Sequence, residues 1–341
     1  MSVIILGIET SCDETSAAVV ADGCVVKSNV IASQVEVHRK YGGVVPEVAS
    51  RRHLESVNVI VAEALEQAGI GFPDLNAIAV TYGPGLAGSL LVGLMSAKAM
   101  AYARAIPLVG VNHLEAHIYA NFLTRPDLEF PQLCLVVSGG HTDLFYTTHH
   151  GNYKLLGRTR DDAAGEAFDK VARVMGLGYP GGPLIERQAQ DGNPKAIDFP
   201  RAYLEEGTYD FSFSGLKTAV LNYLERARRT GQEVSIPDVS ASFQKAVTDV
   251  LVDKVMAAAG EYHPVGIMLA GGVAANSALR EALGVRARAG GYELTVPPLV
   301  LCTDNAAMVA CVGYYKYLRG EFAGPELNAV AAKGLGLFVK R

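Results

Sequence analysis

The sequence has little that would indicate a membrane protein, an exported protein or a disulfide-rich scaffold. Its 341 residues include five cysteines without a C-x-x-C pair, which is typical of reduced thiols in a cytosolic protein. No window holds 18 uncharged apolar residues without glycine and turn breaks, so we expect no membrane-spanning helix. The first apolar run meets an acidic residue at Glu9, too early for a signal peptide. These absences predict a cytoplasmic location.

The sequence also lacks an excess of positive charge. Its formal net charge is −5, whereas a domain that binds nucleic acid by itself is usually basic. Any contact with RNA must therefore be local or shared with a partner. The basic clusters are Arg51-Arg52, Arg158 with Arg160, and Arg226-Ala227-Arg228-Arg229, and each alone is more typical of a solvated face.

A three-strand meander with a tight, polar first turn is predicted twice. Half of the residues are hydrophobic, enough for two domains with their own cores. In the first copy the turn is Glu9–Thr15, and in the second it is Ser138–Asp143. The expected strands are Val3–Ile8, Ser16–Ala21 and Cys24–Val30 in the first copy, and Leu133–Val137, Leu144–Thr148 and Tyr153–Arg158 in the second.

A strand followed by a glycine-rich turn and a helix also occurs twice. Asn76–Thr81 precedes a helix from Leu86 to about Arg104, and Gly266–Ala270 precedes a helix from Ala275 to about Arg288. Together with the meanders, this predicts a duplicated two-domain α/β fold, although chance similarity between common α/β parts remains an alternative. We expect residues 1–110 to form the first domain, completed by a C-terminal helix at about 305–341. Residues 111–304 form the second, with helical insertions, and the two share a cleft.

Two histidines, His113 and His117, lie four residues apart in a predicted helix and therefore on one face. This spacing allows both imidazoles to bind one metal ion, but a solvated helix face is an equally good interpretation. The zincin pattern requires Glu directly after the first His, and Leu114 stands there instead. Asp304, at the start of another predicted helix, is either a helix cap or the third ligand of a site with two histidines and one carboxylate.

Glycine-containing turns are the candidate phosphate contacts. Backbone N–H groups in such turns can bind phosphate oxygens, and glycine lets the main chain approach closely. Ser138–Thr142 is one candidate, and the equivalent turn, with Glu9, Ser11 and Cys12, is the other. The stretch Leu269–Asn276 begins a further helix after two glycines. Asn276 is there either a polar contact to a ligand or a helix cap.

The chain resembles the tRNA adenosine threonylcarbamoyltransferase (TsaD) family, once described as O-sialoglycoprotein endopeptidase, over nearly its whole length. The opening Gly7–Thr15 and the stretch Tyr41–Arg51 are similar to its bacterial branch. Further matching motifs are Tyr82–Leu90, Asn112–His117, Val137–Thr142, Glu166–Lys170 and Tyr179–Pro183. The resemblance implies an actin-like fold of the sugar kinase and Hsp70 superfamily. In that superfamily the first turn reads Asp-x-Gly, and Glu9-Thr10-Ser11 departs from it, which argues against ordinary kinase or ATPase activity.

The resemblance also implies an activity and a set of site residues. Family members transfer the threonylcarbamoyl group from L-threonylcarbamoyl adenylate to the exocyclic amine of the adenosine 3′ of the anticodon, in tRNAs that read codons starting with A. The metal ligands would be His113, His117 and Asp304, with iron(II) favoured and zinc(II) an alternative. The substrate-binding positions would be Val136, Val137, Ser138, Gly139, Gly140, Asp169, Gly182, Glu186 and Asn276, where Glu186 replaces a residue that is often Asp.

Partners follow from the same resemblance. They are tRNA, a paralogous actin-like subunit (TsaB-like) and a small ATPase (TsaE-like). Two other functions remain as alternatives. The first is a metal-dependent glycoprotein endopeptidase, which the missing Glu after His113 argues against. The second is a non-catalytic actin-like ATPase or scaffold, for which the His pair and Asp304 would have no purpose.

Overall fold

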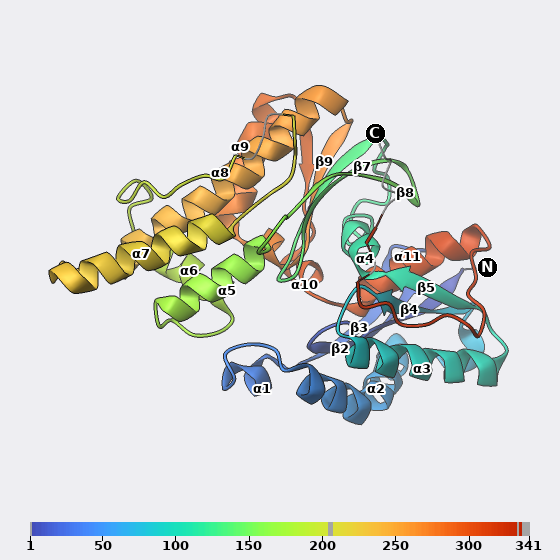
Figure 1. Ribbon diagram of the computed structural model, residues 1–341. Helices are drawn as coiled ribbons and strands as arrows, with labels where there is room; N and C mark the ends of the chain where they lie inside the picture. Colours follow the sequence, from blue (N-terminus) through green and yellow to red (C-terminus); the bar gives the residue numbers. More distant parts are fainter. Residues whose placement is uncertain (1, 204–206, 333, 336–341) are drawn as a thin grey trace. The chain divides into compact units, whose positions relative to one another are not determined.

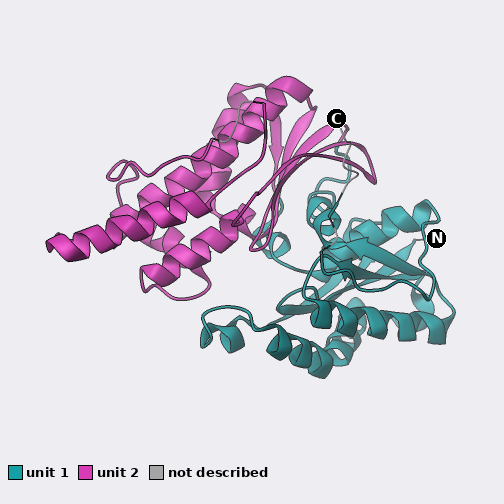
Figure 2. Ribbon diagram, in the orientation of Figure 1, with its two compact units in different colours: residues 1–128, 297–335 teal, residues 129–296, 336–341 magenta. Residues whose placement is uncertain are grey.

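The computed structural model describes residues 2–203, 207–332 and 334–335. The chain divides into two compact units, which Figure 2 shows in different colours. Unit 1 comprises Met1–Leu128 and Pro297–Leu335, and unit 2 comprises Glu129–Val296. The last residues of the predicted C-terminal segment, 336–341, lie outside the described residues. Within the described ranges, no helix combines the length and apolar character needed to cross a membrane.

Unit 1 contains a five-stranded sheet in the order β3-β2-β1-β4-β5. The first three strands form the predicted meander and pair antiparallel, whereas β4 and β5 extend the sheet in parallel with β1. The central strands are almost completely buried, as apolar runs of this kind require. The strands are β1 (Ile4–Glu9), β2 (Glu14–Ala21), β3 (Val25–Ser33), β4 (Ala77–Gly83) and β5 (Leu108–Asn112).

Unit 2 repeats this topology with a sheet in the order β10-β9-β6-β7-β8. Again three strands form an antiparallel meander, and two more are added in parallel on the other side of its first strand. The predicted duplication is therefore present in both sheets. The strands are β6 (Gln132–Val137), β7 (Thr142–His149), β8 (Asn152–Arg158), β9 (Gly266–Ala270) and β10 (Glu293–Thr295).

Helices pack against each sheet within its own unit (Figure 1). Those of unit 1 are α1 (Val35–Arg39), α2 (Pro46–Ala68), α3 (Ala87–Arg104), α4 (His113–Tyr119), α10 (Leu299–Cys302) and α11 (Ala306–Leu318), with a 3-10 turn at Phe72–Asp74. Those of unit 2 are α5 (Ala164–Val174), α6 (Gly181–Ala189), α7 (Ser214–Thr230), α8 (Ile236–Tyr262) and α9 (Ser277–Ala289), with a 3-10 turn at Gly272–Ala275.

The unit boundaries differ from the predicted ones at 110 and 305. The histidine-bearing helix α4 belongs to unit 1 because it packs against α11, where the rings of Tyr119 and Tyr315 lie 5.3 Å apart. The returning segment begins at Pro297, ahead of α10. Helix α2 also starts earlier than the predicted Arg52, at Pro46. Proline fits this first helical position, where its missing N–H would have no intrahelical partner.

Helix α11 lies directly on the central strand β1 at Gly7. A Cβ atom on Gly7 would lie 2.3 Å from the carbonyl oxygen of Ala306 and 2.8 Å from the amide nitrogen of Ala310. Because no real Cβ tolerates such contacts, only glycine permits this approach. The amide of Ala306 also donates to the hydroxyl of Ser16 on β2 at 2.9 Å. The start of α11, and with it Asp304, is therefore fixed to the sheet of unit 1.

Candidate functional site

Helix α4 presents two histidines from a fully buried segment. The side chain of Asn112 caps the helix by accepting hydrogen bonds from the amides of Leu114 at 2.9 Å and Glu115 at 3.3 Å. This cap fixes the helix start next to His113. All seven helical residues are buried, so the helix is held by packing despite its short length. The interpretation of the histidines as part of a solvated face is therefore wrong.

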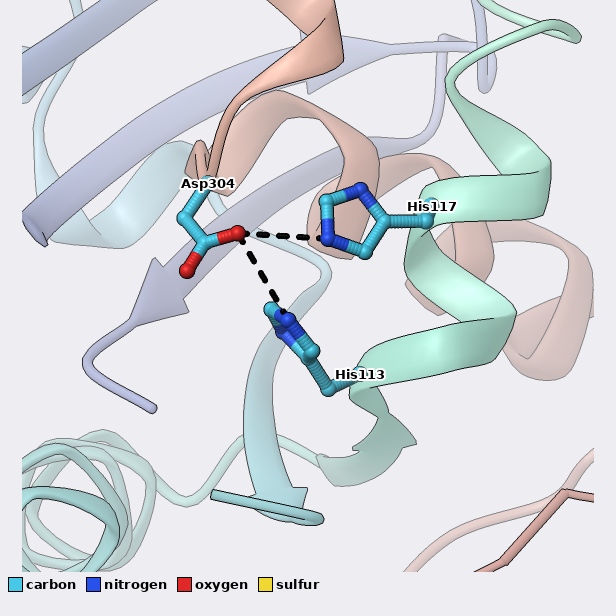
Figure 3. A group of neighbouring side chains, drawn as sticks. All are labelled: His113, His117 and Asp304. Atoms are coloured by element: carbon cyan, nitrogen blue, oxygen red, sulfur yellow. Dashed lines mark ion pairs between the residues drawn. The ribbon is translucent and has the colours of Figure 1, made fainter. Parts of the chain in front are cut away.

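Asp304 lies just outside the cap of helix α11. The capping residue is Asn305, whose side-chain oxygen accepts from the amide of Met308 at 3.1 Å. Asn305 also donates to the carbonyl oxygen of Thr303 at 2.8 Å, which fixes the backbone on both sides of Asp304. The capping role proposed for Asp304 thus belongs to its neighbour, and the Asp304 carboxylate points toward the histidines (Figure 3).

The three side chains form a compact group. Oδ1 of Asp304 lies 3.2 Å from Nε2 of His117 and 3.5 Å from Nε2 of His113. One ligand atom from each residue lies within 4.8 Å of the others (Figure 3). His117 is completely buried, yet neither ring nitrogen makes a hydrogen bond within the described part of the chain. Buried polar atoms normally have partners, so this donor set of two imidazoles and one carboxylate fits a divalent metal ion.

Without a metal ion, the group attracts a proton to His113. Burial alone lowers the pKa of this imidazole, but the carboxylates of Asp304 and Glu9 outweigh burial and raise the pKa to about 9. The effect is mutual for Glu9. Burial raises the pKa of the Glu9 carboxyl, but attraction to His113 outweighs it and holds the pKa below the usual range.

The turn Glu9–Thr15 has different partners from those expected of a phosphate-binding turn. The amide of Ser11 donates to Oε1 of Glu9 at 2.6 Å and is therefore not available to a ligand. The carbonyl oxygen of Ser11 accepts from the amide of Leu86 at 2.8 Å. Burial, together with the charge of Asp13, raises the pKa of the Cys12 thiol well above its ordinary value. The structure thus places Glu9 and Ser11 beside His113 instead.

Asp13 and Glu14 also lie near Cys12 and Asp304, close enough for their charges to interact. The sequence analysis did not propose a role for these two acidic residues. Burial raises the pKa of the Glu14 carboxyl to about 9, and the charges of Asp13 and Asp304 add to this effect. The Glu14 carboxyl therefore holds a proton more tightly than an ordinary glutamate does. The signal in the sequence was two consecutive acidic residues directly before a buried strand.

Unit 2 contains a pocket of about 190 Å³ at the carboxyl ends of β6 and β9. Ligands of open α/β sheets typically bind at this end of the strands. The pocket includes five predicted substrate positions: Gly139, Asp169, Gly182, Glu186 and Asn276. The remaining lining residues are Gly165, Phe168, Pro180, Pro183, Gly272, Val273 and Ala275.

Three glycines leave the interior of this pocket open. A Cβ atom on Gly139, Gly182 or Gly272 would meet no heavy atom within 4 Å. The turn that carries Gly139 is closed by the amide of Ser138, which donates to the carbonyl oxygen of His141 at 2.8 Å. Within the described ranges, the amides of Gly139 and Gly140 have no hydrogen-bond partner. This turn therefore offers two exposed N–H donors to an anion.

The polar residues of the pocket are held by the protein. Asn276 caps α9 through the amide of Leu279 at 3.0 Å and donates to Gln244 at 2.7 Å, so its predicted capping role is present. Asp169 accepts from the amide of Gly181 at 2.7 Å. Oε1 of Glu186 accepts from the amide of Ser277 at 2.8 Å. Each of these bonds ties one element of the pocket wall to another.

Val136 and Val137 differ from the other predicted substrate positions. Both side chains are completely buried in β6, which pairs with a strand on each side, and neither valine lines the pocket. Of the predicted positions, Ser138 and Gly140 lie in the turn beside Gly139. The structure therefore brings the predicted substrate residues of unit 2 together around one pocket edge, with the two valines forming its support.

The chain matches a family model described as tRNA N6-adenosine threonylcarbamoyltransferase over residues 25–311. The curated protein of that name from Moorella thermoacetica is 60% identical over 326 residues, which cover 96% of this chain and 95% of that protein. The one from Desulfitobacterium hafniense is 59% identical over 331 residues, covering 97% of each chain.

Solved structures show the same fold at low sequence identity. Full-length HypF, in a phosphate- and nucleotide-bound form, has a TM-score of 0.62 and 14% identity, covering 94% of this chain and 47% of its own. Component A of the (R)-2-hydroxyglutaryl-CoA dehydratase of Acidaminococcus fermentans has a TM-score of 0.53 and 14% identity. The match covers 93% of this chain and 99% of that one. These likenesses, together with the two matching sheets, show the predicted actin-like fold. By the family match and these identities, the chain belongs to the tRNA N6-adenosine threonylcarbamoyltransferase family.

Proposed function

We propose that this chain transfers the threonylcarbamoyl group from L-threonylcarbamoyl adenylate to N6 of the adenosine 3′ of the anticodon, in tRNAs that read codons starting with A. The products are N6-threonylcarbamoyladenosine and AMP. The proposal rests on the relatives named for this reaction, because each match covers nearly the full length of this chain and of the relative. A glycoprotein endopeptidase is not favoured, because Leu114 is packed in the core where a general base would be required, and Glu115 pairs with Lys316 at 2.9 Å.

The metal site of the proposal consists of His113, His117 and Asp304. Its support is the short distances between the ligand atoms and the buried His117 nitrogens without hydrogen bonds. Two neutral imidazoles and one carboxylate leave a divalent ion with a net charge of about +1, which suits an anionic donor. Iron(II) and zinc(II) both accept these ligands, and we propose iron(II) from the family resemblance.

The adenylate site of the proposal is the pocket of unit 2. The open faces of Gly139, Gly182 and Gly272 leave room for a flat or extended ligand. The amides of Gly139 and Gly140 would bind the phosphate, and the N-terminus of α6 adds the amide of Gly182 and a favourable dipole. Glu186 would contact a ribose hydroxyl through Oε2, since only its Oε1 is used by Ser277.

The reaction needs no enzyme nucleophile. The donor is a mixed anhydride, so attack by N6 of adenosine forms a C–N bond while the bond from the carbonyl carbon to the phosphate oxygen breaks. AMP departs with the electron pair, and N6 loses one proton. A bound divalent metal supplies Lewis acidity, worth several kcal/mol of barrier in comparable enzymes. The residues of this chain hold the donor in the reactive orientation, which lowers the barrier further.

Metal affinity is expected to rise with pH up to about 9. In the metal-free protein His113 has a pKa of about 9, so a metal ion must displace a proton at any lower pH. Affinity should therefore increase about tenfold per pH unit and level off near pH 9. Competition with a chromophoric chelator for zinc(II) between pH 6 and 10 measures this. A plateau that begins at pH 7 would show that His113 has an ordinary pKa.

The stability of the metal-free protein should follow the opposite trend. The folded state binds the His113 proton more tightly than the unfolded chain, in which the pKa is about 6.5. This stabilising contribution is complete below pH 6.5 and is lost as the pH rises through about 9. Urea denaturation of the metal-free protein at several pH values provides the comparison.

tRNA is the substrate of the proposed reaction, and its contacts must come from a few cations. Arg51, Arg52 and Arg160 are each paired with a carboxylate, to Glu47, Glu55 and Asp210. Arg226, Arg228 and Arg229, at the end of α7, are exposed and form no ion pair within the described ranges. Unpaired cations release more counterions on binding phosphate, so this cluster is the best candidate for contact with RNA.

The partners of the proposal are a paralogous actin-like subunit and a small ATPase. Support for an actin-like partner comes from exposed apolar side chains on α2 and α3, two helices that pack together in unit 1. Large apolar side chains exposed on two neighbouring helices fit a surface that a partner protein would cover. Those exposed here are Leu54, Val59, Leu91, Met95 and Tyr102.

The function is tested by nucleoside analysis of tRNA from cells depleted of this protein. N6-threonylcarbamoyladenosine should disappear from tRNAs that read codons starting with A, while other modified nucleosides remain. Re-expression of the chain should restore it. A second assay supplies preformed threonylcarbamoyl adenylate to the purified protein with its partners. Unchanged modification after depletion would exclude the proposed function.

A further inference from the structure

The buried carboxylate of Glu9 contacts His113 on the side of its ring that faces away from Asp304. Glu9 is completely buried at the end of β1, yet it is not one of the residues that face the metal position. Burying a carboxylate is costly unless it is well hydrogen-bonded. Its partners therefore show what keeps it there.

Three donors converge on the two oxygens of Glu9. Oε1 accepts from the amide of Ser11 at 2.6 Å, and Oε2 accepts from the hydroxyl of Thr81 on β4 at 2.7 Å. Nδ1 of His113 lies 3.1 Å from the same Oε2. An ionised carboxylate only accepts hydrogen bonds. Because each oxygen meets a donor, the side chain is held in one orientation and in its charged form.

This arrangement selects one tautomer of His113. If Nδ1 carries the proton and donates it to Oε2, then Nε2 keeps its lone pair. Nε2 is the atom that faces Asp304, at 3.5 Å. The hydroxyl of Ser11 also lies 3.1 Å from Nδ1, and it would select the opposite tautomer if it donated to this atom. The carboxylate favours the first arrangement because it has no proton to give.

We propose that Glu9 is a positioning residue, which together with Thr81 fixes His113 with Nδ1 protonated and Nε2 ready to bind the metal ion. The inference rests on the proposed metal site. It adds the residues that contact a ligand of that site and not the metal ion itself. Partners of this kind typically contribute ten- to a hundredfold to metal affinity. His117 has no such partner among the described residues, so the support is specific to one of the two histidines.

The substitution Glu9→Gln tests the proposal most sharply. An amide has one acceptor and one donor end, so it satisfies either Ser11 or His113 and opposes the other. Zinc(II) affinity, measured by chelator competition, should fall roughly ten- to a hundredfold. The cobalt(II) absorption spectrum should change because one imidazole is no longer held in place. Thr81→Val should weaken affinity in the same direction, and Thr81→Ser, which keeps the hydroxyl, should restore it.

Two further variants separate this role from general damage. Glu115→Gln alters another buried carboxylate, which pairs with Lys316 at 2.9 Å and not with a histidine. Its zinc affinity should stay at the wild-type value even if its urea denaturation midpoint falls as much as that of Glu9→Gln. Ser11→Ala should also keep wild-type affinity. Loss of affinity in Ser11→Ala with none in Glu9→Gln would overturn the proposal, because the hydroxyl would then set the tautomer.

Zinc(II) binding by the wild-type protein separates the test of the metal site from the test of the role of Glu9. Wild-type protein that binds no zinc(II) at these residues would remove the metal site and this inference with it. Wild-type protein that binds zinc(II) stoichiometrically, with equal affinity in Glu9→Gln, would leave the metal site standing and exclude only the role of Glu9.

Discussion

Replacing Asp304 by alanine is expected to release the metal ion and reduce threonylcarbamoyl transfer roughly a thousandfold. Among the described residues of the returning segment, Asp304 is the one proposed ligand, and two imidazoles alone hold first-row metals weakly. A lost Lewis acid worth about 4 kcal/mol corresponds to about three powers of ten in rate. Elemental analysis and a transfer assay with preformed adenylate measure the two effects. His113→Ala and His117→Ala should behave alike.

The neighbouring cap provides the control for Asp304. Asn305→Ala removes the hydrogen bond to the amide of Met308 and should cost about 1 kcal/mol of stability. Its metal content should remain stoichiometric, because the three ligands are untouched. If Asp304→Ala kept its metal and Asn305→Ala lost it, the residues at the start of α11 would be structural and the site assignment would be wrong.

Filling the unit 2 pocket at Gly272 should weaken donor binding without unfolding the chain. The Cβ position of Gly272 faces open space, so Gly272→Leu places its side chain in the volume that we assign to the adenylate. Overlap of this kind typically costs about 1–3 kcal/mol, or about 5- to 150-fold in affinity. Calorimetry with a non-hydrolysable adenylate analogue measures the loss. Transfer to tRNA should fall in parallel at low donor concentration.

Gly260→Leu is the matched control for this pocket. Gly260 lies near the end of α8, its Cβ would also meet no atom within 4 Å, and it does not line the pocket. Donor affinity should be unchanged in this variant. Equal affinity in both variants would place the donor elsewhere, whereas loss in both would indicate a general effect of added apolar surface.

Much of the fold was predictable because it depends on local patterns. Buried strands such as β1 and β6 read as short apolar runs between polar turns, and the repeated order of elements revealed the duplication. The short strand β5 was missed, because its last residue, Asn112, is also the cap of the histidine helix and no turn separates the two elements. The start of α2 was missed because Pro46 was not recognised as a first helical residue.

The sequence indicated which three residues meet at the candidate metal site, but not which residues hold them in place. Spacing of four indicated that His113 and His117 share a helix face, and a motif implied Asp304. The spacing of apolar residues does not show which residue caps a helix, so the sequence could not decide whether Asp304 or Asn305 caps α11. The position of Glu9 beside His113 depends on β1, β4 and α4 meeting in space, from residues more than seventy positions apart in sequence. Glu9 was therefore interpreted as part of a phosphate turn.

Unit 1 is built from two segments that the ribosome produces at different times. Helix α11 contacts β1, β2, β4 and β5, and the glycine at position 7 lets it lie directly on the central strand. Residues 1–128 therefore lack a central packing element until Pro297–Leu335 has been synthesised, by which time the whole of Glu129–Val296 has emerged. The segment Glu129–Val296 of unit 2 is one continuous stretch of sequence, so this unit can fold first. Because Asp304 arrives with α11, a nascent chain brings the three proposed metal ligands together only as unit 1 closes.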